Sequence, residues 1–345
     1  MNKPLISVLC SSYNHEKYAG YFIKCLQNQT YTNWELIIID DCSTDNNVFE
    51  IQNFLSDERI HFEKMSINSG SSIVTSKAFS ISKGEIIIDF ASDDGLDPTY
   101  FETVVKIFSE NEKVGVVYNS LKIIDENNNF YDEWVTKSRD KISILRELFY
   151  DQNVLFSTGF AVRREFYEKL VPMNFACIQH QDYKWHIQLL SWTDCFILEK
   201  PLVQYRIQRK NSISLGTLSQ SAINRVHLEE NYLMNTFLSI KNPKMIEEIV
   251  LDPRFHNFDR SLIPFVLGMS VQKSKNIYKK QWGYQLLIDF FEEENNFTLI
   301  NKLFDFDFHD FLNLSDSIFY NEKKERYIFV KKILKKLKKI FKRDL

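Results

Sequence analysis

Residues 85–95 read EIIIDFASDDG, and this stretch decides both the fold and the site that we expect. Residues 86–88 have the branched, apolar composition of a strand that is buried on both faces. Two carboxylates, Asp93 and Asp94, follow that strand directly. Ligands of open α/β sheets bind where strands end, and paired carboxylates there suit a divalent cation. A solvated Asp-Asp-Gly turn is the alternative that this motif alone leaves open.

The first third of the chain alternates short apolar runs with helical patterns. The predicted strands are residues 5–10, 35–39, 60–63, 86–90 and 114–118. The predicted helices are residues 18–26, 48–55, 73–82 and 99–110. Such alternation is typical of βαβ units, so we expect an α/β fold in which helices flank a mostly parallel central sheet.

Three of the predicted strands end in polar clusters. Residues 11–14 read SSYN, residues 40–43 read DDCS, and residues 92–94 read SDD. Because the carboxyl ends of parallel strands meet at one edge of a sheet, these hydroxyls and acids are expected to lie together. Their convergence favours a functional site over an accidental surface feature.

Beyond residue 118 the pattern changes twice. Residues 119–215 mix strands and helices, and a helix that continues to residue 190 carries Asp182 in its first turn, where an acid is also favoured electrostatically without any catalytic role. Long helical patterns then replace the strands. We expect a catalytic domain at 1–215 with halves 1–118 and 119–215, a helical region at 216–326, and a basic amphipathic helix at 327–345.

Composition narrows the class of protein. The chain has 345 residues, of which 44% are hydrophobic and 26% are charged, so it is globular rather than disordered. A net charge of -3 gives no basic field for nucleic acid, which we do not expect as a partner. Residues 331–343 nevertheless hold eight Lys or Arg and no acid. A basic amphipathic segment at 327–343 favours an anionic membrane surface, and packing on the domain or on a partner is the alternative.

The cysteines and the chain ends point to a compartment. Five cysteines without a CxxC pair favour a reducing environment over a disulfide framework or a zinc site. The chain runs from Met1 into a strand pattern without a signal-peptide pattern, and no apolar run reaches the roughly 20 residues of a membrane span. We expect a cytoplasmic protein that is peripheral on the inner face of the cytoplasmic membrane.

A series of motifs resembles a known family. Residues 6–14 read ISVLCSSYN, 29–35 QTYTNWE, 40–45 DDCSTD, 83–85 KGE and 92–94 SDD, in this order. The series resembles the family-two inverting glycosyltransferases of the GT-A fold, in their bacterial, non-processive form, and covers roughly the first 215 residues. The helical C-terminal extension has no counterpart in the resemblance.

The resemblance implies a nucleotide-sugar donor, a UDP-sugar, held at the first strand ends. It matches Ser11 and Tyr13 to positions that cradle the base, with Tyr13 stacked on it. It matches Asp41 to the acid that hydrogen-bonds the base and Asp93 to a residue that contacts the ribose. Lys77 lies where a basic residue assists the phosphates.

The resemblance also implies the chemistry. It matches Asp94 to the ligand of Mg or Mn and Asp182 to the catalytic base, and single displacement then turns an α-linked donor into a β-linked product. Ala91 stands where relatives often have a further Asp, and Gln181 where they usually have Glu. Arg206 or Arg209 is a candidate for compensating the diphosphate charge. The Gln-x-x-Arg-Trp signature of processive synthases is absent, which favours transfer of one sugar per acceptor.

The function so implied is an inverting, metal-dependent, hexosyltransferase-type enzyme. Its acceptor is a hydroxyl of a glycan or lipid-linked glycan in bacterial surface polysaccharide synthesis, whether of capsule, lipooligosaccharide or O-antigen. The C-terminal helices are a candidate surface for a homodimer. Two alternatives stay open: a sugar nucleotidyltransferase, although no glycine occurs before Gly20, and a non-catalytic nucleotide- or glycan-binding protein that retains the fold.

Overall fold

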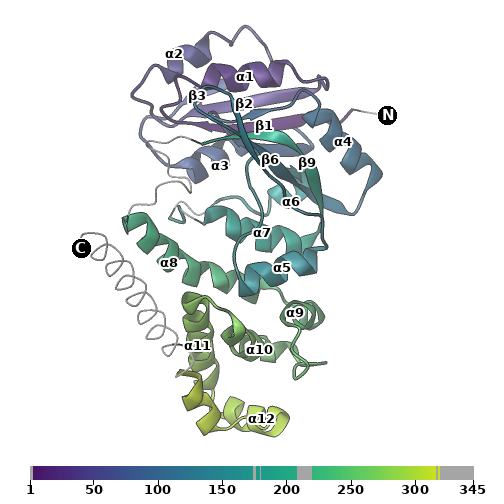
Figure 1. Cartoon of the computed structure of the whole chain (residues 1–345), viewed down its shortest axis with the longest axis vertical. Coiled ribbons are helices and arrows are strands. Elements are labelled where there is room, and N and C mark those ends of the chain that lie inside the picture. The colour runs from purple at the N-terminus through teal and green to yellow at the C-terminus, as the bar shows by residue number, and fades with distance from the viewer. Residues whose placement is uncertain (1–2, 174–175, 179, 208–219, 316–317, 319–345) are drawn as a thin grey trace, which may run out of the picture. The chain divides into compact units, whose positions relative to one another are not determined.

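The computed structural model describes residues 3–173, 176–178, 180–207, 220–315 and 318, and it divides into two compact units (Figure 1). The first unit takes Met1–Leu148 and Asn153–Glu229, and the second takes Phe149–Gln152 and Glu230–Leu345. The basic segment 327–345 lies outside the described residues. Every strand end discussed below belongs to the first unit.

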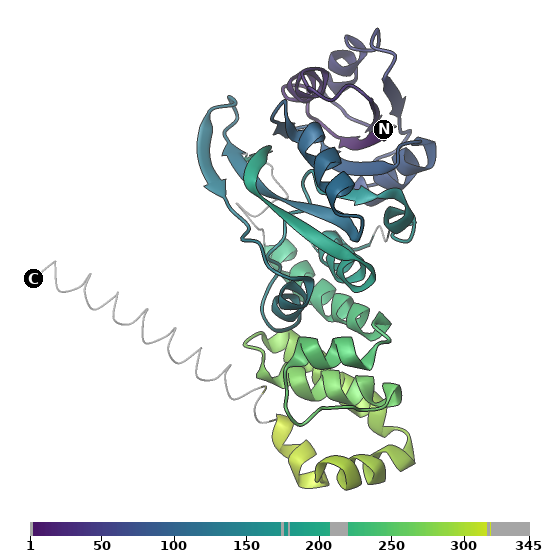
Figure 2. The same cartoon turned by 90° about the vertical axis from the view of Figure 1, so that its right-hand side faces the viewer.

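One sheet organises the first unit. Its strands are β1 (Ile6–Ser12), β2 (Trp34–Asp40), β3 (Ile60–Lys64), β4 (Ile86–Ala91), β5 (Gly95–Leu96), β6 (Val114–Ile124), β7 (Phe130–Trp134), β8 (Ala161–Arg163) and β9 (Asp194–Arg206). The order along the sheet is β3-β2-β1-β4-β8-β6-β9-β5, and β7 pairs with β6. Strands β3, β2, β1 and β4 are joined in parallel, as are β6 and β9, which run side by side in Figures 1 and 2. The expected α/β fold with flanking helices is confirmed, although β5, β7 and β8 pair in antiparallel fashion.

Helices cover both faces of this sheet. Their bounds are α1 (Ala19–Gln27), α2 (Asn47–Gln52), α3 (Ser71–Ile81), α4 (Tyr100–Glu110), α5 (Lys141–Tyr150), α6 (Arg164–Tyr167) and α7 (Gln181–Trp192). Alternate residues of β1, such as Ile6 and Val8, join α1, α2 and α4 in one hydrophobic core. Helix α3 contacts β1 and β2, and α6 contacts β4. Both faces of the strands are therefore covered, which explains their unbroken apolar runs.

The second unit is helical. Helix α8 (Gln220–Met234) begins in the first unit and ends in the second. The elements that follow it are η1 (Asn235–Ser239), α9 (Pro243–Val250), η2 (Arg260–Leu262), α10 (Ile263–Ser270), η3 (Val271–Lys273), α11 (Ile277–Phe291) and α12 (Glu294–Phe304). Its core is aromatic: the buried ring of Phe265 lies within 6.1 Å, centroid to centroid, of Phe291 and closer to Phe255 and Phe304. The predicted helical C-terminal extension is confirmed. No helix among the described residues is long and apolar enough to cross a bilayer.

One long strand spans two apolar runs of the sequence. Residues 195–198 and 202–205 are both part of β9, which continues through Pro201. The β6–β9 ladder changes register between Asn119 and Leu121, and this irregularity lets the proline stay inside the strand. The five cysteines are all free.

Candidate active site

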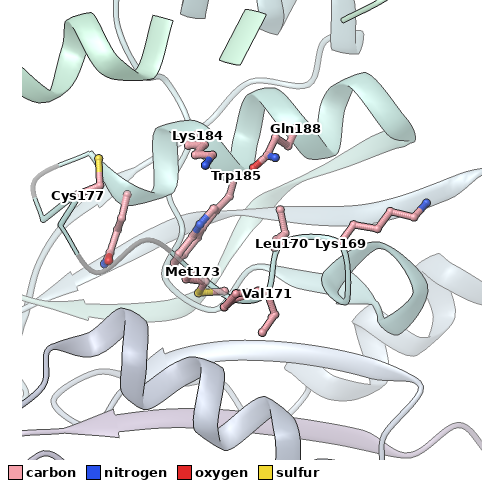
Figure 3. Close-up of a pocket in the computed structure, with 10 residues that line it drawn as sticks. Lys169, Leu170, Val171, Met173, Cys177, Lys184, Trp185 and Gln188 are labelled. Atoms are coloured by element: carbon pink, nitrogen blue, oxygen red, sulfur yellow. The ribbon is translucent and has the colours of Figure 1, made fainter. Parts of the chain in front are cut away.

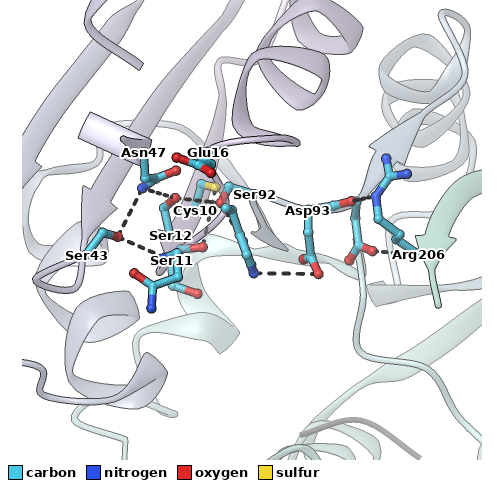
Figure 4. A network of polar contacts seen from close by, with 12 residues as sticks. Cys10, Ser11, Ser12, Glu16, Ser43, Asn47, Ser92, Asp93 and Arg206 are labelled. Atoms are coloured by element: carbon cyan, nitrogen blue, oxygen red, sulfur yellow. Dashed lines mark hydrogen bonds and ion pairs between the residues drawn. The ribbon is translucent and has the colours of Figure 1, made fainter. Parts of the chain in front are cut away.

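The ends of β1, β2 and β4 lie level with one another. In the parallel ladders Ser12 is paired with Asp40 and Ser11 with Ala91, so the polar residues that follow each strand emerge at one edge. Ser12 and Ser92 share a hydrogen bond of 2.6 Å between their hydroxyls (Figure 4). The sequence prediction that these clusters meet at one edge is confirmed for β1, β2 and β4.

A buried amide ties this edge together. The Nδ2 of Asn47 donates to Ser12 Oγ at 2.8 Å and to Asp40 Oδ1 at 2.7 Å. Asp40 Oδ2 accepts from the backbone N–H of Ser43 at 2.9 Å, and its side chain is fully buried. Asp40 thus fixes the turn after β2, and these buried hydrogen bonds hold Ser12, Asp40 and Asn47 together.

The neighbouring Asp41 organises the start of α3. Its Oδ1 accepts from the Ser69 N–H at 2.7 Å and its Oδ2 from the Gly70 N–H at 2.8 Å. Gly70 has a φ of 84°, a backbone conformation that favours glycine. A carboxylate has about four acceptor sites, so Asp41 retains acceptor capacity for a ligand N–H after binding both amides.

Tyr13 presents an aromatic face at the same edge. It follows β1 directly, and its side chain is 41% exposed, unusual for a large ring in a unit with a well-covered sheet. The next residue, Asn14, adopts a φ of 55° and accepts from the Thr44 N–H at 2.9 Å, which fixes the turn after β1. Ser11 is half-buried at the end of the same strand. The two residues lie where a planar base has access to them.

The two acids of the SDD motif have different surroundings. Asp94 is buried, and its Oδ1 accepts from the Arg206 backbone N–H at 3.0 Å. Burial, followed by the charge of Asp93, raises the pKa of Asp94 well above its usual range. Asp93 is more accessible, and its Oδ2 lies 3.7 Å from His15 Nε2. His15 is in turn held at Nδ1, 2.9 Å from Ser92 Oγ, so it couples Asp93 to the hydroxyl network.

Arg206 has a structural role that corrects the sequence prediction for it. Its guanidinium donates from Nε to the Asp93 carbonyl at 2.6 Å, from Nη1 to the Asp125 carbonyl at 2.6 Å, and from Nη2 to Asn128 Oδ1 at 2.7 Å. The residue is 2% exposed, and its guanidinium carbon lies 4.5 Å from the Tyr18 ring centroid. Because its guanidinium donates to backbone carbonyls and to Asn128, Arg206 positions the loop of Asp93 instead of binding a diphosphate. Arg209 lies outside the described residues.

Replacing Arg206 with methionine is expected to lower the free energy of unfolding by about 3 kcal/mol or more, because two carbonyls lose a charged donor. Urea unfolding measures the change. Lys137→Met removes an exposed cation that pairs with Glu199 at 3.3 Å and is the matched control, with an expected effect within about 0.5 kcal/mol. Equal midpoints for the two variants would show that Arg206 does not hold this loop.

Lys77, on α3, is paired with an acid of β3. Its ammonium pairs with Glu63 Oε2 of β3 at 2.6 Å, and this hydrogen bond is the main cause of the lowered pKa of Glu63. Ser11, Tyr13, Asp41, Asp93 and Asp94 follow or end β1, β2 and β4. The structure brings those five together at one edge of the sheet, whereas the ammonium of Lys77 is bound by Glu63 of β3.

Asp182 lies in the first turn of α7, with its side chain 24% exposed. Its Oδ2 is 3.4 Å from Asn153 Nδ2, 3.4 Å from Ser157 Oγ and 3.8 Å from His186 Nε2. Burial opposes ionisation, but the interactions with His186, His180 and the Tyr183 backbone N–H outweigh it, and the pKa of Asp182 is lowered from its ordinary value. Asp182 is therefore a carboxylate at neutral pH.

The first turn of α7 is anchored beside the first turn of α3. Gln181 Oε1 accepts from Ser72 Oγ at 2.6 Å, and Gln181 Nε2 donates to Ser71 Oγ at 3.3 Å. These serines directly follow Gly70, whose N–H is bound by Asp41. The contacts place the helix end that carries Asp182 next to the backbone that Asp41 organises. The sequence missed this role of Gln181, and its place beside Asp182 was the available signal.

A pocket of about 130 Å³ borders α7 (Figure 3). Its walls include Met173, Cys177, Trp185 and Gln188. Pockets that enclose a ligand of nucleotide size usually measure about 300–1,000 Å³, so this one is too small for a sugar nucleotide. The open edge at β1, β2 and β4 is the better candidate for the donor.

Comparison with known proteins identifies the family. Residues 7–171 match the model described as Glycosyl transferase family 2. The matched residues belong to this family. An uncharacterized glycosyltransferase of Nostoc sp. is 29% identical to it over 257 residues, which are 68% of this chain and 75% of that protein. The family-two glycosyltransferase described here is accordingly an enzyme.

Two further proteins are similar to parts or most of the chain. The UDP-Glc:alpha-D-GlcNAc-diphosphoundecaprenol beta-1,3-glucosyltransferase WfgD of Escherichia coli is 31% identical over 127 residues, 37% of this chain and 49% of WfgD. The chain therefore aligns with about half of WfgD. The solved structure of S. aureus TarS 1–349 in complex with UDP-GlcNAc superposes with a TM-score of 0.58 at 15% identity, covering 92% of each chain. This likeness confirms the predicted GT-A fold of the glycosyltransferase.

The residues of the family-two glycosyltransferase fit a divalent cation held mainly by its substrate. Among the described residues there is no group of three or more His, Cys, Asp or Glu that could hold a metal ion without help. The buried carboxylate of Asp94, with Asp93 beside it, is a hard oxygen donor whose charged form gains from a cation. Mg²⁺ is usually bound by one or two carboxylates together with substrate phosphates, and Asp94 is the residue that would hold it.

Proposed function

We propose that this family-two glycosyltransferase is an inverting, metal-dependent enzyme that transfers one sugar from a UDP-sugar to a hydroxyl of a glycan or lipid-linked glycan. The observation that carries the proposal is the position of the ionised Asp182. Its helix end is joined through Gln181 to Ser72. Ser72 lies in the first turn of α3, directly after the Gly70 backbone that Asp41 binds. The residues that we assign to donor binding and to proton transfer thus lie in one unit of the chain. The name of WfgD, with its UDP-Glc donor and beta product, supports the same reaction class.

The residues divide the work between binding and proton transfer. Tyr13 offers a stacking face for the base, Asp41 accepts its N–H, and Asp93 accepts from the ribose hydroxyls. Asp94, with Mg²⁺ or Mn²⁺, is assigned to the diphosphate. A divalent cation, when bound, neutralises the charge that develops on the departing UDP.

Asp182 then acts on the acceptor. Its carboxylate takes the proton of the acceptor hydroxyl while that oxygen forms a bond to the anomeric carbon and the bond from that carbon to the diphosphate breaks. The proton ends on Asp182 and the electron pair leaves with UDP. A single displacement inverts the anomeric carbon, so an α-linked donor yields a β-linked product.

A donor panel tests the proposal. The full chain is incubated with UDP-, GDP- and dTDP-sugars and Mn²⁺ or Mg²⁺, and donor hydrolysis and the configuration of the released sugar are followed by proton NMR. We expect turnover of a UDP-sugar that EDTA stops and a first-formed β-anomer. UDP binding without turnover of any donor would favour a non-catalytic binding protein, and nucleotide-sugar synthesis from a sugar phosphate and UTP would favour a nucleotidyltransferase.

We also propose that residues 327–343 hold the enzyme at the anionic inner face of the cytoplasmic membrane, where a lipid-linked acceptor in bacterial surface polysaccharide synthesis would lie. The support is the sequence: eight Lys or Arg without an acid between residues 331 and 343, alternating with apolar residues at helical spacing. The names of relatives such as WfgD, whose acceptor is a diphosphoundecaprenol, agree with a lipid-linked substrate.

Deleting residues 327–345 is expected to abolish binding to vesicles that contain phosphatidylglycerol, because each basic residue near such a surface contributes about 1 kcal/mol. Cosedimentation at low and high salt measures the loss. A full-length variant with the eight basic residues changed to Gln is the matched control and should also fail to bind. Equal vesicle binding by the truncated and intact chains would exclude this segment as the anchor.

A further inference from the structure

Four residues after Asp182, α7 carries a second titratable side chain, His186. Residues four apart lie on the same face of a helix, so the two side chains face one another. His186 is fully buried, and its Nε2 lies 3.8 Å from Asp182 Oδ2. The distance is longer than a hydrogen bond but within reach of a small change of side-chain torsion.

The buried Nε2 of His186 has no hydrogen-bond partner, whereas the other ring nitrogen has one. Nδ1 lies 3.2 Å from the hydroxyl of Tyr118, on β6. Leaving a buried polar nitrogen unpaired destabilises the fold, so this position of the side chain calls for a compensating role. The polar side chain that Nε2 approaches is the carboxylate of Asp182.

Tyr118 decides where the imidazole proton lies. Burial, then the charges of Cys195 and Asp182, raises the pKa of Tyr118 well above its usual range, so its hydroxyl keeps its proton. That hydroxyl can donate to Nδ1, and the neutral imidazole then carries its own proton on Nε2. The ring of His186 is also held edge-on to Tyr118 and Phe160, with centroids 5.1 Å and 6.4 Å away. Both the plane of the ring and its tautomer are thereby fixed.

We propose that His186 is a positioning residue for Asp182: Tyr118 holds it in the tautomer that directs an N–H at Oδ2 of the carboxylate that takes the acceptor proton. This inference rests on the proposed function of Asp182 as the base. Asn153 and Ser157 approach the same oxygen, so the three donors anchor the carboxylate through Oδ2. The distances shorten when an acceptor orders the site, as is common for catalytic hydrogen bonds.

The pH dependence follows from the groups around the carboxylate. His186 of α7 and His180, which directly precedes α7, both lower its pKa. The charge of Asp182 also raises the pKa of Tyr118, on β6, and of Cys177, in the segment before α7. A base works when ionised, so its lowered pKa extends activity toward acid pH. Without His186, the pKa-raising effect of burial on Asp182 is offset less, so the pKa of Asp182 should rise. The acid limb of the rate profile should then move to higher pH.

Three variants at one position test the inference. His186→Leu removes the donor, His186→Gln offers an amide N–H at the position of Nε2, and His186→Asn offers one nearer Nδ1. The pH profile of kcat/KM for sugar transfer and the calorimetric affinity for UDP with Mn²⁺ are measured for each. We expect kcat/KM to fall roughly tenfold or more in His186→Leu and His186→Asn, with the acid limb at higher pH, and both effects to be largely reversed in His186→Gln. UDP affinity should stay unchanged in all three.

The outcomes separate this inference from the assignment of the base. A wild-type pH profile in His186→Leu, or equal losses in the Gln and Asn variants, would overturn the positioning role. If His186→Leu fails to fold, the comparison of Gln with Asn still decides. Full transfer by Asp182→Asn would instead overturn the base itself, whatever the His186 variants do. Tyr118→Phe, which frees the tautomer, should show the same direction of change as His186→Leu with a smaller amplitude.

Discussion

Replacing Asp182 with asparagine is expected to lower the rate of sugar transfer by a factor of about 10²–10⁴ and to leave UDP affinity unchanged. The amide keeps the size of the carboxylate and its contacts with Asn153 and Ser157, but it cannot take the proton of the acceptor. The base contributes only when the acceptor hydroxyl is attacked, so the loss should appear in kcat and not in donor binding.

Rates of transfer and calorimetric UDP affinity, measured side by side, check this result. Asp194→Asn is the matched control. Asp194 is an acid of the same unit at the start of β9, and its half-exposed side chain pairs with Lys141 of α5 at 2.7 Å. It should transfer sugar at the normal rate. Normal transfer by Asp182→Asn would show that another group takes the proton, and a parallel loss of UDP affinity would assign Asp182 to the donor instead.

Replacing Asp94 with alanine is expected to abolish metal-dependent binding of UDP, and with it turnover. Asp94 is the buried carboxylate of the SDD motif, and no larger ligand set occurs among the described residues to replace it. Calorimetry with UDP plus Mn²⁺, and again with EDTA, isolates the metal-dependent part of the affinity. The residual affinity should equal that of the wild type in EDTA.

Two controls distinguish a lost ligand from a lost fold. Asp94→Asn keeps an oxygen for the Arg206 N–H, so its melting temperature should stay near that of the wild type while metal-dependent binding is strongly weakened. Asp132→Ala removes an exposed acid of β7 and should change neither property. Retained metal-dependent affinity in a folded Asp94→Ala would place the cation elsewhere.

The strands that build the site could be predicted because strands that are buried on both faces have a recognisable apolar sequence. Residues 86–88 are covered on both faces, and only an unbroken apolar run survives there. Strand β7 could not be predicted in this way, since all but one of its residues are exposed and no face needs to be apolar. Strand β5 has two residues and exists only through its pairing with β9.

The same contrast applies to the site. The acids at the strand ends were predictable because a short motif and a sheet edge define them locally. The role of Arg206 was not, since the carbonyl of Asp125 that it binds lies 81 residues away in the sequence. His186 was within reach of prediction, because its spacing from Asp182 is helical, but the tautomer depends on Tyr118, 68 residues away. Partners so distant in sequence are known only once the sheet has formed.

The most direct test of the central claim is a crystal structure of the enzyme with a UDP-sugar and Mn²⁺. The account predicts the base against Tyr13 and Asp41, the diphosphate at Asp94, and the carboxylate of Asp182 on the side of the anomeric carbon opposite the leaving group. A donor bound away from the ends of β1, β2 and β4, or one whose anomeric carbon faces away from Asp182, would contradict it.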